Sequence, residues 1–159
     1  MEPLTDARRL QLEFWSEFRE RLKNRPEIPS VPFAHARYWF DVSLGRTGIH
    51  LSNVANTSQN FIGIRVYLRN DIADAALAQL QEQREEIEKE LGTELDWNPN
   101  PHNRDKIIML SREADLSARS RWPEYLEWLA DWNARFRTVF SPRVRRLSLE
   151  RGASVDDEQ

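Results

Sequence analysis

Three consecutive segments that alternate apolar and polar side chains constrain the fold more than any other feature of the sequence. They cover residues 38–44, a stretch that begins at Ile49, and residues 61–69. Such alternation predicts β-strands with one buried face, because successive side chains of a strand point to opposite sides. A turn with two glycines, residues 45–48, separates the first two segments, and the polar run 56–60 separates the last two. The pattern therefore predicts an antiparallel meander.

Helical segments are expected on both sides of this meander. Apolar residues spaced by three or four predict helices over residues 6–24, 71–91 and 122–141. Gly92 is well placed as a left-handed cap of the second helix, because glycine adopts positive φ without a steric penalty. Pro142 is expected to kink or end the last helix, since proline lacks a backbone N–H.

Two short strands are expected between the second and third helices, near residues 95–97 and over residues 106–112. The order is then helix, three strands, helix, two strands, helix. This order predicts an α+β fold with a mostly antiparallel sheet of about five strands packed against helices. We expect one domain over residues 1–151 and a disordered acidic tail over residues 152–159. If the helices share the apolar face of the sheet, its polar face stays open.

Composition excludes several classes of chemistry. The chain has no cysteine, which excludes disulfides, thiolate zinc sites, iron–sulfur clusters and a cysteine nucleophile. The net charge is -3, but the charges are unevenly distributed. Residues 71–96 contain nine acidic and two basic residues, and the remainder of the chain is basic. This distribution neither excludes nor establishes an anionic partner. The sequence lacks a long apolar run and a signal-peptide core, so we expect a cytoplasmic protein with no membrane partner.

Four strings carry a resemblance to a known family: HARYWFDVSLGRTGIHLSNVANTSQNFIGIRVYLRN, AQLQEQREEIEKELGTELDW, WPEYLEWL and RFRTVFSPRVRRL. In pattern and order, residues 8–147 resemble the prokaryotic domain of unknown function 4268. Members of that family often follow a nuclease-like domain of the PD-(D/E)XK type. The resemblance implies a compact α+β accessory module in DNA processing or defence, and it supplies no catalytic residues. No nuclease-like segment precedes residue 8, so we expect a free-standing member or a fragment.

The residues do not support the usual catalytic sites. A PD-(D/E)XK nuclease needs an acidic residue two positions before its lysine, whereas Arg21, Ile87 and Arg104 precede Lys23, Lys89 and Lys106 at that spacing. The glycine turn at residues 45–48 lacks the lysine of a phosphate-binding loop. The three histidines have no zinc-ligand spacing, and we expect neither a metal nor a cofactor.

The expected polar sheet face supports a functional hypothesis. It would carry Trp39, Arg65, Tyr67 and Arg69, with Arg46 at a hairpin tip. Arginines contact phosphates and exposed rings stack on bases, so this set predicts a non-catalytic module that binds nucleic acid.

Two alternative functions remain open. One is a protein-interaction or dimerisation adaptor without nucleic-acid contact, with a nuclease-type protein or a second copy as the partner. A less favoured alternative is an enzyme that uses Asp41, His50 and Ser52 as a serine triad.

Overall fold

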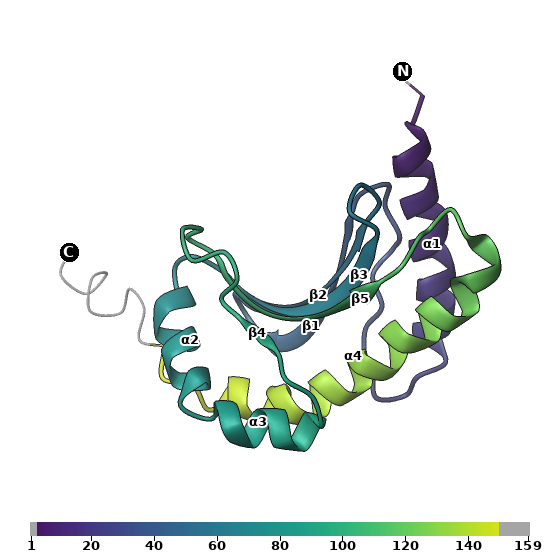
Figure 1. The fold of residues 1–159 in the computed structure, drawn as a ribbon. Helices are drawn as coiled ribbons and strands as arrows, with labels where there is room; N and C mark the ends of the chain where they lie inside the picture. Colours follow the sequence, from purple (N-terminus) through teal and green to yellow (C-terminus); the bar gives the residue numbers. More distant parts are fainter. Residues whose placement is uncertain (1–2, 150–159) are drawn as a thin grey trace.

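The computed structural model describes residues 3–149, and the expected acidic tail lies outside them. Figure 1 shows a bent sheet with helices beneath it and at its ends. The elements, in chain order, are α1 (Asp6–Lys23), β1 (Trp39–Arg46), β2 (Ile49–Asn56), β3 (Phe61–Leu68), α2 (Ala73–Gln81), α3 (Arg84–Leu91), β4 (Asp96–Trp97), β5 (Lys106–Glu113), a 3₁₀ turn (Arg119–Arg121) and α4 (Trp122–Arg145). The α+β prediction is confirmed.

The five strands form one antiparallel sheet in the order β1-β2-β3-β5-β4. The first three strands are the predicted meander, and β5 adds to its far side by pairing with β3. The sheet curves, so it has a convex and a concave face. In Figure 1, α4 runs beneath the convex face, α1 stands at one end of the sheet and α2 at the other.

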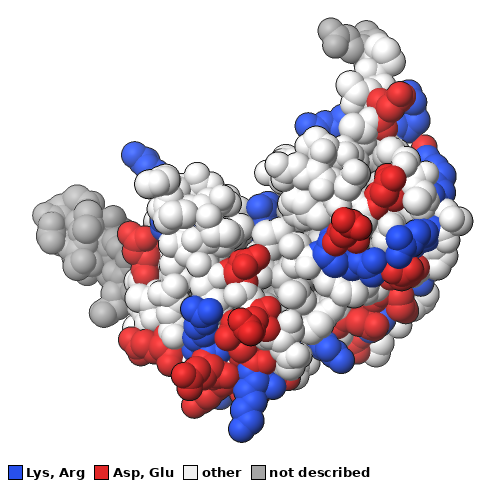
Figure 2. Space-filling model, viewed as in Figure 1, with Lys and Arg blue, Asp and Glu red and all other residues white. Residues whose placement is uncertain are grey.

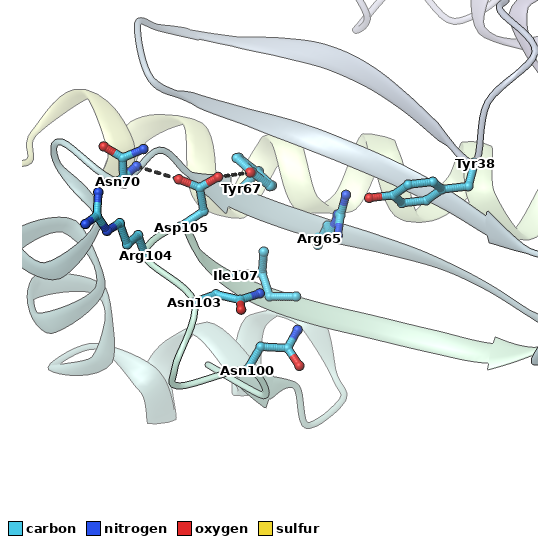
Figure 3. A pocket seen from close by; sticks show the side chains of 9 residues that line it. All are labelled: Tyr38, Arg65, Tyr67, Asn70, Asn100, Asn103, Arg104, Asp105 and Ile107. Carbon is cyan, nitrogen blue, oxygen red and sulfur yellow. Dashed lines mark hydrogen bonds between the residues drawn. The ribbon is translucent and has the colours of Figure 1, made fainter.

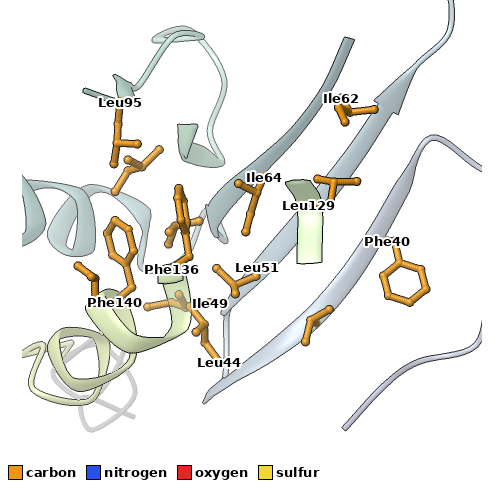
Figure 4. Close-up of a cluster of buried hydrophobic side chains, with 14 of the residues drawn as sticks. Phe40, Leu44, Ile49, Leu51, Ile62, Ile64, Leu95, Leu129, Phe136 and Phe140 are labelled. Carbon is orange, nitrogen blue, oxygen red and sulfur yellow. The ribbon is translucent and has the colours of Figure 1, made fainter. Parts of the chain in front are cut away.

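The convex face carries the hydrophobic core. Figure 4 shows Leu51 and Ile64 of the strands beside Phe136 of α4, with Leu129 of α4 and Phe40 of β1 in the same buried cluster. These five side chains are almost completely shielded from solvent. Burial of this apolar surface is the main force that holds the sheet against its helices.

The first helix completes the same core at one end of the sheet. The rings of Trp15 and Phe18 lie 5.5 and 5.4 Å from the ring of Phe40 on β1. The ring of Phe14 lies 5.2 Å from that of Trp122 at the start of α4. Elements near both ends of the described chain therefore share one core.

The single helix predicted over residues 71–91 is wrong, because the chain forms two helices that meet at residues 82–83. In a continuous helix, the apolar stripe would pass through position 84, which is an arginine. The break lets Arg84 stay exposed while Ile87 and Leu91 are buried in the core, and α3 lies against α4. Gly92 adopts φ of 78° at the end of α3, as the cap prediction requires.

The last helix does not stop at Pro142 but continues to Arg145. A proline removes one N–H from the helix, and the buried side chains Phe140 and Val144 on either side keep the helix packed on the core. Among the helices of residues 3–149, none is both long and apolar enough to cross a membrane.

Candidate nucleic-acid interface

The concave face of the sheet is open and forms a trough. Figure 2 shows a hollow between two raised ends of the molecule, at the position of this face in Figure 1. Two adjoining cavities of about 310 and 270 Å³ share Tyr38, Arg65 and Tyr67 in their walls. A third cavity of about 470 Å³ also includes Tyr38 and extends to Arg8 and Gln11 of α1. The trough therefore runs across the sheet, with Tyr38 common to all three cavities.

Arg65 occupies the middle of the trough. Its position on β3 lies between its register partners Ser52 on β2 and Met109 on β5. Its guanidinium carbon is 5.3 Å from the ring centre of Tyr67 and 5.9 Å from that of Tyr38. Its Nε is buried without a hydrogen-bond partner, and the guanidinium forms no ion pair with any of residues 3–149. Arg65 is thus a cation beside two rings without a direct ion-pair partner among residues 3–149, although its charge interacts with that of Asp41.

Asp41 and His50 lie beside Arg65 and contact each other. His50 Nε2 is 3.2 Å from Asp41 Oδ2. The His50 ring stacks on Tyr67 at 5.0 Å with an interplanar angle of 15°. Burial acts to raise the pKa of Asp41, but the side chains of His50 and Ser52 and the charges of His50 and Arg65 outweigh it. The pKa of Asp41 therefore lies below its ordinary value, and the carboxylate stays ionised.

The residues of the hypothetical serine triad share the concave face without forming a triad. Ser52 is the register partner of Asp41, so serine and aspartate are neighbours across two strands. Ser52 Oγ is buried and makes no hydrogen bond of regular geometry with His50 or any other described residue. A nucleophilic serine needs its base within hydrogen-bond reach, and here His50 contacts Asp41 instead.

Tyr67 is fixed at one side of the trough by a partly exposed hydrogen-bond network. Its hydroxyl donates to Asp105, whose other carboxylate oxygen accepts from the backbone N–H of Asn70 at 2.7 Å. Burial and this contact with Asp105 raise the pKa of Tyr67 to about 12. The network also links β3 to the loop that precedes β5, as Figure 3 shows.

Two of the five candidate residues have partners of their own. Arg46 Nη1 donates to the carbonyls of Val144 at 2.9 Å and Leu147 at 2.7 Å, so it caps the C-terminus of α4. Arg69 forms a two-pronged ion pair with Asp71, at 2.7 and 2.8 Å. The structure brings together Trp39, Arg65 and Tyr67 and places Arg46 and Arg69 outside the cavities that these three line.

Sequence reasoning missed several residues in and beside the trough. Alternation over residues 38–44 would place Tyr38 on the apolar face with Phe40, but β1 begins one residue later and Tyr38 faces the cavities. Arg37 covers the ring of Trp39 at 4.4 Å, and its Nε is buried without a partner. Arg104 lines the 310 Å³ cavity and pairs with no acid of residues 3–149. The Arg-Tyr-Trp run at residues 37–39 was a signal for this cluster.

A comparison with protein-family models identifies most of the chain. The model described as Domain of unknown function (DUF4268) matches residues 10–144. The chain belongs to this family. The match covers α1 through almost all of α4, so the DUF4268 domain includes the whole sheet and its trough.

Searches of the curated proteins and of the solved structures found no match to this DUF4268 chain. Within residues 3–149, no three histidine or acidic side chains are grouped as metal ligands. The concave face of this DUF4268 domain is therefore interpreted from its own residues.

Proposed function

We propose that the concave face binds single-stranded nucleic acid and that the domain is a recognition module without catalytic activity of its own. The observation that carries this proposal is Arg65, an unpaired guanidinium held between two tyrosine rings in an open trough. A guanidinium in this position contacts a phosphate or stacks on a base, and both contacts are common in single-strand binding.

The aromatic side chains of the trough support the same function. Tyr38 is 43% exposed, and its ring lies 4.9 Å from that of Trp39 at the edge of β1. Exposed rings supply stacking surfaces for successive bases, and such stacking tolerates different sequences. A single strand offers unpaired bases to these rings, whereas a duplex keeps its bases stacked and paired.

The distribution of charge also favours an anionic ligand at this face. Arg65 and Arg104 line the trough, and Arg37 lies over the ring of Trp39 beside it. None of these three arginines forms an ion pair within residues 3–149. The exposed acidic residues of α3 gather on the other side of the molecule, at the lower left of Figure 2. A nucleic-acid backbone that approaches the concave face therefore avoids the acidic helix.

Fluorescence anisotropy with labelled single strands of about 15 nucleotides tests the proposal, because single-strand sites span about 4–16 nucleotides per domain. We expect Arg65→Ala to weaken binding about tenfold or more, equivalent to about 1.4 kcal/mol. Affinity should also fall with rising salt, since phosphate contacts release counterions.

Arg69→Ala is the matched control. It removes an arginine that directly follows the same strand, but one that Asp71 already neutralises. We expect its affinity to stay within about twofold of the wild type. Equal affinities of wild type and Arg65→Ala at low salt, or no binding by the wild type, would contradict the proposal. Light scattering of the same samples reports whether a second copy is involved.

A further inference from the structure

The cavity of about 310 Å³ at one end of the trough has an unusual lining of amides. Asn70, Asn100 and Asn103 contribute side chains to its wall, together with Arg104 and Ile107. Figure 3 shows these residues around the space beside Tyr67 and Arg65. None of the three amide side chains forms a hydrogen bond with residues 3–149. Each amide offers one acceptor and two donors to a ligand.

The loop that carries two of these amides is held in place by hydrogen bonds. The backbone N–H of Asn103 donates to the carbonyl of Asn100 at 3.0 Å, and Lys106 Nζ donates to the carbonyl of Pro101 at 2.7 Å. Asp105 links the end of the loop to Tyr67 and to the backbone of Asn70. A loop fixed in this way loses little conformational entropy when a ligand binds.

The other walls of the cavity are suited to a flat ring. The exposed ring of Tyr38 and the guanidinium of Arg65 lie on the side away from the Asn100–Asn103 loop, as Figure 3 shows. The side chain of Ile107 adds an apolar surface next to Asn103. The cavity volume is at the lower end of the range of about 300–1,000 Å³ for small-molecule sites. It therefore accommodates a group the size of one nucleotide rather than a duplex.

We propose that this cavity takes one unstacked base of the bound strand and that Asn100 and Asn103 read its hydrogen-bonding edge, with adenine preferred. This inference rests on the proposed single-strand binding and adds a base-reading site to it. Adenine is the expected base because a side-chain amide pairs with its amino group and a ring nitrogen through two hydrogen bonds. Tyr38 and Arg65 then stack on the face of the base, as aromatic and arginine side chains do in single-strand recognition.

Binding of homopolymeric strands of dA, dC and dT, each of about 15 nucleotides, tests this inference. We expect wild type to bind dA about fivefold or more tightly than dT. In Asn100→Ala/Asn103→Ala, this ratio should fall to about one, while the affinity for dT stays within about twofold of the wild-type value. A matching rA strand distinguishes DNA from RNA as the favoured polymer, because only RNA carries the 2′-hydroxyl.

Asn24→Ala is the matched control, because Asn24 is exposed at the end of α1 and lines none of the trough cavities. It should keep the full preference for dA. If the wild type binds all three strands with equal affinity and this binding requires Arg65, the base-reading site is overturned but the proposed single-strand binding is not. A preference for dA that survives in the double variant does the same. Absence of any binding by wild type overturns both.

Discussion

The two faces of the sheet differ in how many of their buried polar side-chain atoms have a hydrogen-bond partner. On the convex face even a buried amide has partners, because Asn53 on β2 and Asn133 on α4 bond to each other at 2.6 and 3.3 Å. On the concave face, Asp41 Oδ1, Ser52 Oγ and Arg65 Nε are buried and lack a hydrogen-bond partner among residues 3–149. Arg137 Nε on α4 also lacks a partner, but three such atoms lie together on the concave face. Unsatisfied buried groups cost stability, so this grouping favours a role in binding. The convex face then stabilises the fold, and the concave face is available for a ligand.

Substitution of one aromatic residue on each face gives the largest expected contrast. Phe40→Ala opens a cavity among the rings of α1 and the strands, and we expect it to lower the free energy of unfolding by about 3–5 kcal/mol. Tyr38→Ala removes an exposed ring of the concave face and should change that free energy by only about 0.5 kcal/mol. Urea denaturation of both variants measures the difference. Equal losses in the free energy of unfolding would show that the concave face contributes as much to the hydrophobic core as the convex face.

The buried amide pair tests whether the convex face depends on complete hydrogen bonding. Asn133→Ala removes the partner of the Asn53 side chain, which is 0% exposed. We expect a loss of about 1–3 kcal/mol in the free energy of unfolding, because the buried Asn53 amide then loses both of its bonds to Asn133 and keeps only the one to the Phe40 carbonyl. In Asn53→Ala/Asn133→Ala, the loss should be smaller than the sum of the two single losses. Strictly additive losses in the urea experiment would show that the two amides do not act as a pair.

Substitution of Arg46 tests whether this arginine stabilises the fold without contributing to binding. Arg46→Gln removes the guanidinium that bonds the carbonyls of Val144 and Leu147, and we expect a loss of about 1–2 kcal/mol of stability. Affinity for single strands should be unchanged, because Arg46 lines neither of the two central cavities. Arg135→Gln, which removes an exposed arginine that stacks on Trp132 at 4.7 Å, is the control and should cost less. If Arg46→Gln has normal stability but binds single strands weakly, Arg46 contacts the ligand instead.

The smallest expected effect is the pH dependence of the Tyr67 network. Burial and Asp105 raise the pKa of Tyr67 from 10.0 to about 12 in the folded protein. The folded state therefore holds this proton more tightly, and the resulting stability is complete below pH 10 and lost as the pH rises toward 12. The free energy of unfolding of wild type should fall across this window more than that of Tyr67→Phe. Parallel curves for the two proteins would mean that Asp105 does not stabilise the hydroxyl.

The strands of this domain could be predicted from the sequence because their signal is local. β1 and β3 have apolar residues at alternate positions, and β2 does so at Ile49 and Leu51. The turns between the strands contain glycine or several polar residues. The open polar face followed from the same alternation, which is why Trp39, Arg65 and Tyr67 were found together. Gly92 was predictable for a similar reason, since a glycine after a helical stripe is a common cap.

The features that sequence reasoning missed depend on contacts between distant residues. Nothing near Arg46 in the sequence indicates that the end of α4, about a hundred positions later, supplies its carbonyl partners. The break between α2 and α3 depends on the packing of α3 against α4, which periodicity within residues 71–91 does not reveal. The loop with Asn100 and Asn103 was interpreted only as a turn, because its role as a cavity wall requires the neighbouring strands.

The contact between Phe14 of α1 and Trp122 of α4 has a consequence for how the chain folds. These residues are separated by most of the sequence, yet their rings meet at 5.2 Å in one core. Closing so long a loop costs entropy before any burial compensates it, which slows folding of the complete core. During synthesis, Trp15 and Phe18 can pack on Phe40 of β1, but the ring of Phe14 cannot meet Trp122 until α4 leaves the ribosome. Until then this part of α1 is a hydrophobic surface that a chaperone can bind.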